Sequence, residues 1–151
     1  MQNRKKRVLP LIITILIMVF IFLQSALPAD LSQEESNLIV QALIEFLHAD
    51  AEFLSFVVRK CAHFTEYLLL GVSLHATVRE YDPVWLEGGE RLRRTALLAW
   101  GIGALYALTD EVHQAFVPGR SCEIRDMLID SCGVAAGVLI MTVLRSRRLK
   151  S

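Results

Sequence analysis

The sequence has few cysteines, no net charge and no alternation of polar and apolar residues, and each absence argues against a class of protein. Its three cysteines are an odd number without C-x-x-C or other metal-ligand spacing, which argues against a cysteine-based metal site. The lack of a two-residue period argues against a membrane β-barrel. No internal repeat or low-complexity tract interrupts the 151 residues, so we expect a single domain over 1–151.

What the sequence does contain is apolar residues gathered in long blocks. Apolar types make up 54% of the chain, and the first block, 8–27, holds twenty residues without a charge. A helix needs about 20 mainly apolar residues to cross a bilayer, and lipid accepts only helices and closed barrels. The pattern therefore predicts an all-α, four-helix transmembrane bundle with spans at about 8–27, 61–78, 95–114 and 127–144.

The basic residues are balanced by acids overall but are unevenly placed along the chain. Twelve of the sixteen lie before the first span, between the second and third, or after the fourth. The positive-inside rule then places both termini and the 79–94 loop in the cytoplasm. Because topology accounts for these basic clusters, nothing in the sequence favours binding to nucleic acid.

The segment that opens the chain has two interpretations. Its basic start is typical of a secretory signal, but its apolar stretch is longer than a usual signal core and no clean Ala-x-Ala motif follows. We therefore expect an uncleaved anchor. Between this span and the next, Ser32 and Glu35 form a capping box, and apolar residues then share one helical face as far as Leu47. This predicts an extra outer amphipathic helix that serves as a packing element.

Two cysteines, Cys61 and Cys122, are expected near the outer face. In an oxidising compartment they would be able to form a disulfide. The alternative is that they are small buried residues, as free cysteines commonly are, and we favour this second interpretation.

Ionisable residues enter the later blocks at helical spacing. Arg59, His63 and Glu66 fall within about 60° of one another on a helix, with Tyr67 beside them. In the third block Asp110, His113 and Gln114 share one side, and Glu111 lies about 100° away from Asp110. In the fourth, Asp126 and Asp130 are one turn apart and lead into Gly133-x-x-x-Gly137, a motif that lets membrane helices pack closely.

The predicted topology sends all three polar columns to the outer half of the membrane, so we expect them to meet in one outward-facing pocket. Intramembrane acids and histidines almost always face the bundle interior or a wet cavity and pair with one another. The plainest interpretation is an ion-pair network that locks helices together. The same residue types also suit a divalent metal site, which we favour less than the network.

Two further chemistries remain open for this pocket. A His and a Glu in a poorly hydrated site suit general acid–base catalysis, although no nucleophile stands out. Arg59, Lys60, Arg120 and Arg125 are the outer basic residues, and arginine suits a phosphate or carboxylate. The alternative for these four is that they extend toward lipid headgroups or pair with acids and bind nothing specific.

Two strings of the sequence resemble the VanZ-like family of small membrane proteins, whose name-giving member is associated with resistance to teicoplanin. They are "RKCAHFTEYLLLG", 59–71, and "DEVHQAFVPGR", 110–120, the second followed by Asp126 and Asp130. The resemblance implies a role in the bacterial cell envelope, near lipids or cell-wall precursors. The candidate catalytic residues are His63, Glu66, Asp110, Glu111 and His113, and the candidate ligand-binding residues are Arg59, Lys60, Tyr67, Gln114, Arg120, Asp126 and Asp130.

The sequence thus predicts a multi-pass protein of the bacterial cytoplasmic membrane that binds or modifies an envelope lipid or lipid-linked cell-wall precursor. Altered susceptibility to glycopeptides would be one consequence. The competing hypothesis is a structural or partner-binding membrane protein whose polar residues lock the helices together without catalysis.

Overall fold

Helices make up the whole regular structure of the residues that the computed structural model describes, which are 2–28, 40–41, 50–82 and 88–150. They are α1 (Gln2–Ser25), α3 (Ala51–Tyr81), α4 (Gly88–Gln114) and α5 (Ile124–Lys150), and no strand occurs among these residues. The all-α bundle predicted from the apolar blocks is confirmed. The predicted amphipathic helix over 32–47 lies outside the described residues, apart from positions 40 and 41.

The helix ends follow from local sequence chemistry. Asp50 caps the start of α3 by accepting a hydrogen bond from the Phe53 backbone N–H at 3.0 Å. α4 ends at Gln114, shortly before the Pro118-Gly119 stop signal, where Gly119 has a φ of 75° that favours glycine. All four helices begin before the apolar blocks that predicted them, because the residues preceding each block also adopt helical conformation.

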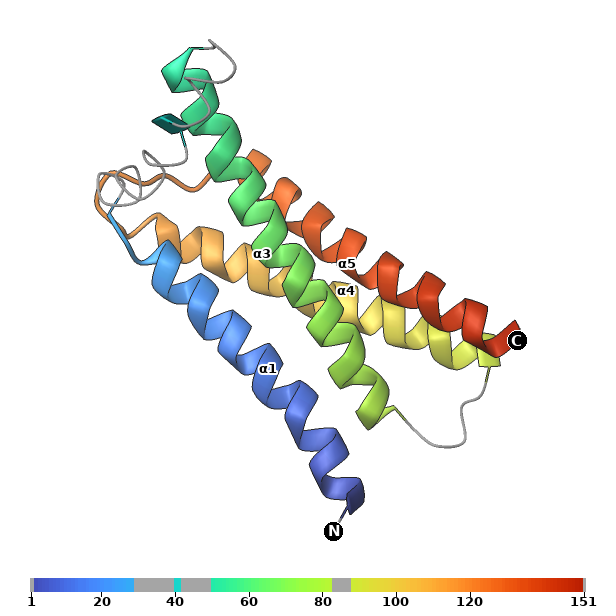
Figure 1. Cartoon of the computed structure of the whole chain (residues 1–151). Helices are drawn as coiled ribbons and strands as arrows, with labels where there is room; N and C mark the ends of the chain where they lie inside the picture. The colour runs from blue at the N-terminus through green and yellow to red at the C-terminus, as the bar shows by residue number, and fades with distance from the viewer. Residues whose placement is uncertain (1, 29–39, 42–49, 83–87, 151) are drawn as a thin grey trace.

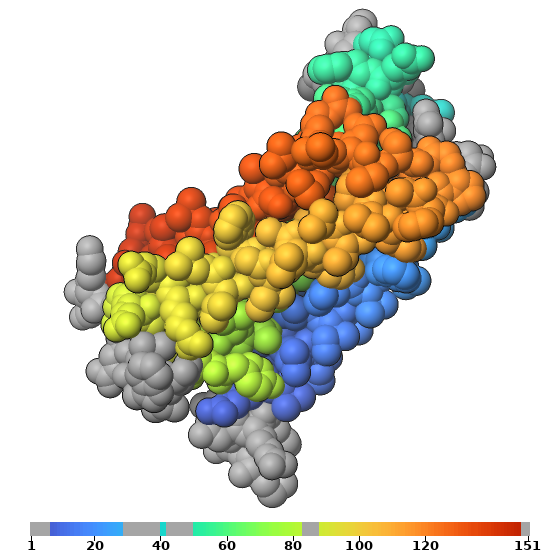
Figure 2. All heavy atoms as spheres, turned by 180° about the vertical axis from the view of Figure 1, so that it is seen from behind, coloured from blue at the N-terminus to red at the C-terminus, as the bar shows by residue number. Residues whose placement is uncertain are grey.

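α3 is the central helix of the bundle and packs against the other three (Figure 1). The start of α1, the end of α3, the start of α4 and the end of α5 lie toward one end of the bundle (Figure 1). From behind, α4 and α5 lie side by side, with α1 along the edge of α4 (Figure 2). The opposite end, where α1 and α4 finish and α5 begins, holds most of the predicted site residues, and we call it the pocket end.

Among the residues that the structure describes, two helical stretches have the length and apolar composition of a membrane span, namely Arg7–Ser25 of α1 and Ile124–Arg148 of α5. α3 and α4 carry more polar and ionisable residues and do not meet the same criterion. Large apolar side chains are nevertheless exposed on all four helices, for example Leu16, Leu69, Leu105 and Leu139.

Glycines bring α5 into direct backbone contact with α3. A Cβ atom added at Gly133 would lie 2.6 Å from the Phe64 carbonyl oxygen, and one at Gly137 would lie 2.1 Å from the Leu68 carbonyl oxygen. Gly71 makes the reciprocal approach, because its Cβ would lie 2.3 Å from the carbonyl oxygen of Val134. The close-packing face predicted from Gly133-x-x-x-Gly137 is confirmed, and α3 is the helix that it packs against.

The interpretation of the cysteines as small buried residues is wrong. Cys61, Cys122 and Cys132 are all exposed, and none forms a disulfide. The physical reason for Cys61 is its helical position, about 160° from Arg59, which turns it away from the interior of the pocket end.

A cationic pocket and a buried carboxylate at one end of the bundle

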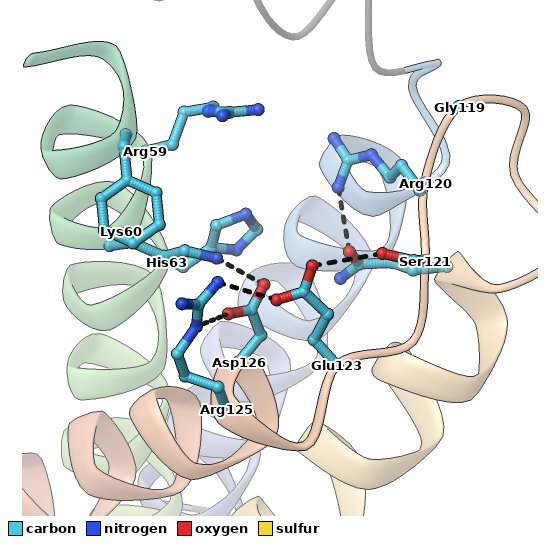
Figure 3. A pocket seen from close by; sticks show the side chains of 11 residues that line it. Arg59, Lys60, His63, Gly119, Arg120, Ser121, Glu123, Arg125 and Asp126 are labelled. Carbon is cyan, nitrogen blue, oxygen red and sulfur yellow. Dashed lines mark hydrogen bonds and ion pairs between the residues drawn. The ribbon is translucent and has the colours of Figure 1, made fainter. Parts of the chain in front are cut away.

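A cavity of about 210 Å³ opens at the pocket end, between α3, the segment after α4 and the start of α5 (Figure 3). We call it the cationic pocket. Its wall includes all four basic residues expected on the outer side, and its lining consists of Phe56, Arg59, Lys60, His63, Gln114, Gly119, Arg120, Ser121, Glu123, Arg125 and Asp126.

Two of the four basic residues in the cationic pocket are neutralised by carboxylates. Lys60 of α3 forms an ion pair with Asp126 of α5. Arg125 donates to Glu123 at 2.9 Å and lies 3.9 Å from Asp126. The Phe56 ring lies against both cations, with its centroid 5.4 Å from the Lys60 ammonium and 5.3 Å from the Arg125 guanidinium. These contacts join α3 to the start of α5. They also pair both acidic residues of the pocket lining, Glu123 and Asp126, with a base.

The other two basic residues, Arg59 and Arg120, have no carboxylate partner among the described residues. Arg59 forms no hydrogen bond or ion pair there, and its Nε is buried without a partner. Arg120 donates to two neutral acceptors, the Gln114 side-chain oxygen at 3.2 Å and the Gln24 carbonyl at 3.3 Å. Figure 3 shows their side chains on opposite sides of the pocket mouth, extending toward the same space.

The electrostatic consequence is a site that favours an anion. Four basic side chains line the cationic pocket against two acidic ones, so the lining carries two uncompensated positive charges. Burial lowers the pKa of Arg120, while nearby Asp110 raises it. Because an arginine pKa starts above 12, the guanidinium remains charged at neutral pH. Paired guanidinium groups facing one cavity are suited to a phosphate or carboxylate.

His63 lies on the inner wall of the cationic pocket, where the pocket adjoins a deeper chamber of about 10 Å³. The His63 Nδ1 is 3.9 Å from the Glu66 carboxylate, which is too long for a hydrogen bond. Asp130 and Glu111 line the same chamber, and Asp130 is 2% exposed. A chamber of this size has room for about one water molecule.

Beside the cationic pocket, Asp110 is the centre of a buried hydrogen-bond network. Its Oδ2 accepts from the Ser25 hydroxyl at 2.7 Å, the Tyr67 hydroxyl at 3.0 Å and the Gln114 amide at 3.1 Å. We call these four residues the Asp110 cluster. It joins the end of α1 to α3 and α4, and its members are all buried. Gln114 also belongs to the pocket lining, so the cluster supports one wall of the pocket.

Two other predicted residues of α4, Glu111 and His113, have different hydrogen-bond and ring contacts, although Glu111 lines the same small chamber as His63 and Asp130. Glu111 is 1% exposed, and its carboxylate accepts a hydrogen bond from the Glu123 backbone N–H at 2.7 Å, immediately before α5 begins. A carboxylate in this place satisfies a free N–H and interacts favourably with the helix dipole. His113 stacks on Phe22 of α1, with ring centroids 4.5 Å apart. Of the candidate catalytic residues, His63 and Glu111 therefore line one small chamber, whereas Asp110 lies in its own cluster and His113 packs on α1. The catalytic role of all five stays a prediction.

The sequence model of one family matches residues 10–145 of the chain, which include most of the four helices and the whole cationic pocket. The chain belongs to the VanZ/LLP1 family. This confirms the resemblance inferred from the strings at 59–71 and 110–120 and extends it over nearly the whole chain. Comparison with curated proteins and with solved structures gave no match.

The site of this VanZ/LLP1 protein includes residues that sequence patterns did not identify. Ser25, which donates to Asp110, is a polar residue at the end of a mainly apolar span. Its position there is the sequence feature that could have identified it as a site residue. Phe56 precedes Lys60 by one helical turn and shares its face. Within the described residues of this VanZ/LLP1 chain, no group of three or more His, Cys, Asp or Glu side chains is arranged to hold a metal ion.

Proposed function

We propose that this VanZ/LLP1 protein binds the phosphate headgroup of an envelope lipid or lipid-linked cell-wall precursor in the cationic pocket. One observation carries the proposal: Arg59 and Arg120 face the same cavity without a carboxylate partner among the described residues. Exposed cations that merely support the fold are expected to pair with nearby acids, as Lys60 and Arg125 do. The Arg59 side chain is half-buried and its buried Nε has no partner among the described residues, which is unfavourable, and a bound phosphate would offer that N–H an acceptor.

The proposal includes a multi-pass topology in the bacterial cytoplasmic membrane. α1 and α5 have the composition of membrane spans, and Leu69 of α3 and Leu105 of α4 are 51% and 64% exposed. Large exposed side chains of this kind are favourable against lipid and costly against water. Four crossing helices with both termini in the cytoplasm agree with the placement of the basic residues and would open the cationic pocket to the outer face.

Binding, rather than a defined reaction, is the function that the geometry supports best. His63 lies in the pocket wall and would be close to a bound phosphate, but it lacks the hydrogen-bonded carboxylate that would orient it as a general base. Chemical modification of the lipid therefore stays a prediction, which a comparison of lipid extracts from cells with and without the protein would test. Changed glycopeptide susceptibility would follow if the bound lipid is a target or a precursor of the wall.

A structural role is the second candidate, and the Asp110 cluster is the observation that favours it. The Asp110 carboxylate of α4 accepts hydrogen bonds from side chains of α1 and α3, so the cluster connects three helices. Glu111 connects α4 to the start of α5. These contacts account for Asp110 and Glu111 as elements that fix the bundle. They do not account for Arg59, which has no partner in the bundle among the described residues.

The experiment that tests phosphate binding compares Arg59→Ala and Arg120→Ala with a matched control, Arg93→Ala. Arg93 is an exposed arginine at the far end of α4. The purified proteins are titrated in detergent with a short-chain phosphatidic acid. A charge-assisted hydrogen bond contributes about 1.5–3 kcal/mol, so each pocket variant should bind at least about tenfold more weakly than Arg93→Ala. Equal affinity of all three variants would refute the proposal.

A further inference from the structure

A second cavity, of about 250 Å³, lies between α1 and α3 and has the opposite character. Its lining is apolar except for one carboxyl group, and consists of Ile13, Leu16, Ile17, Phe20, Leu69 and Glu66. We call it the α1–α3 groove. From Ile13 to Phe20 it follows α1 for about 10 Å, at 1.5 Å per residue, which is roughly a third of the thickness of a hydrocarbon core.

The α1–α3 groove begins where the inner wall of the cationic pocket ends. His63 lines the pocket, and Glu66, about one helical turn further along α3, lines the groove. The His63 Nδ1 and the Glu66 Oε2 are 3.9 Å apart, so the linings of the two cavities are close to each other at this point. Phe20 and Glu66 lie at the end of the groove nearest the pocket, and Ile13 and Leu69 lie at the far end. A molecule with a charged head and an apolar chain would match these two adjoining cavities, with its head in the cationic pocket and its chain in the α1–α3 groove.

Glu66 distinguishes the groove from an ordinary lipid-facing surface. Its Oε2 atom is buried and has no hydrogen-bond partner among the described residues. A buried polar atom without a partner is unfavourable, and the methylene groups of a bulk acyl chain offer none. A hydroxyl group at the junction of head and chain would supply the missing donor.

From these contacts we propose that the α1–α3 groove holds the apolar chain of the same lipid whose phosphate occupies the cationic pocket, and that Glu66 accepts a hydrogen bond from a hydroxyl beside that chain. The inference rests on the proposed phosphate binding and narrows its ligand class. The ligand is a single-chain glycerophosphate lipid with a free hydroxyl, in which two guanidinium groups bind the phosphate and one carboxyl binds the hydroxyl. The apolar groove then binds the chain.

The test separates the groove from the pocket by varying the protein and the probe together. Leu69→Trp fills the groove, and Leu105→Trp places the same side chain on an exposed position of α4 as the matched control. Each variant is titrated with 1-oleoyl-glycerol 3-phosphate and with glycerol 3-phosphate, which has no chain. Leu69→Trp should weaken binding of the oleoyl lipid at least tenfold and leave binding of glycerol 3-phosphate unchanged, while Leu105→Trp should change neither.

A third probe, the oleoyl lipid with its free hydroxyl methylated, tests the role assigned to Glu66. The native protein should bind the methylated lipid several-fold more weakly, and Glu66→Ala should bind both lipids alike. If Leu69→Trp binds the oleoyl lipid as tightly as Leu105→Trp does, the groove does not hold the chain, even where Arg59→Ala still weakens phosphate binding about tenfold. If the arginine variants bind glycerol 3-phosphate normally, the pocket proposal itself fails.

Discussion

Replacement of Gly137 by alanine should separate α5 from α3, because the added methyl group has no space. Its Cβ would lie 2.1 Å from the Leu68 carbonyl oxygen and 2.9 Å from the Val72 backbone nitrogen. Ordinary contact begins at 3.4 Å, so the two helices must move apart by about 1 Å at this point. The obstructing atoms belong to the backbone of α3 and are unable to rotate away as a side chain would.

The magnitude follows from two opposing effects. Overpacking of a well-packed interface costs about 1–3 kcal/mol, and the upper end applies here because the obstruction is rigid. Alanine is favoured over glycine inside a helix by up to about 1 kcal/mol, which offsets part of that cost. The net loss for Gly137→Ala is therefore about 2 kcal/mol of the free energy of unfolding.

Gly101→Ala is the matched control, because a Cβ at Gly101 meets no atom within 4 Å. It is also a helical glycine, and it should be neutral or stabilising by up to about 1 kcal/mol. Unfolding of both variants by titration of a denaturing detergent, followed through helix content by circular dichroism, measures the difference directly. A Gly137→Ala variant as stable as Gly101→Ala would show that the glycine contacts do not determine the α3–α5 packing.

Two further predictions address the Asp110 cluster and the orientation of the chain. Asp110→Ala removes the acceptor of three buried donors and should lower the free energy of unfolding by about 2–4 kcal/mol. Asp110→Asn keeps an acceptor and should lower it by less. Thermal unfolding in detergent measures both losses, and equal losses would contradict the hydrogen-bond account. In a variant that keeps Cys122 as its single cysteine, a membrane-impermeant maleimide should label the protein in intact cells. In a variant whose single cysteine is introduced by Ser146→Cys, the protein should be labelled only after lysis. The reverse pattern would invert the proposed topology.

The orientation of single residues around the helices was less predictable from the sequence than the helices themselves. Asp110, His113 and Gln114 share one side of a helix, but their partners differ. Asp110 accepts from Ser25 of α1 and Tyr67 of α3, whereas His113 stacks on Phe22 of α1. Gln114 also accepts from Arg120, in the segment after α4. A helical wheel gives angles within one helix, but it contains no information on which neighbour each side meets. The partner is set by how the helices cross, which depends on contacts such as Gly137 against Leu68.

The electrostatic character of the pocket was predicted only in part for a similar reason. The sequence identified Arg59, Lys60, Arg120 and Arg125 as basic residues at one end, since charge and span order suffice for that. Which of them would be neutralised depends on distances of a few ångströms between separate elements. α5 places Asp126 beside Lys60 and leaves Arg59 without a partner among the described residues.

By itself, then, the sequence determined the helices, their order and the close-packing face of α5. These properties depend on interactions within a few residues, namely the apolar blocks, the caps and the spacing of small residues. The tertiary structure decided that Glu111 caps α5, that Ser25 completes the Asp110 cluster and that Glu66 lies in a groove. Each of these joins side chains from different helices or loops, and only the rotation and crossing of the packed helices bring them within hydrogen-bond or van der Waals distance.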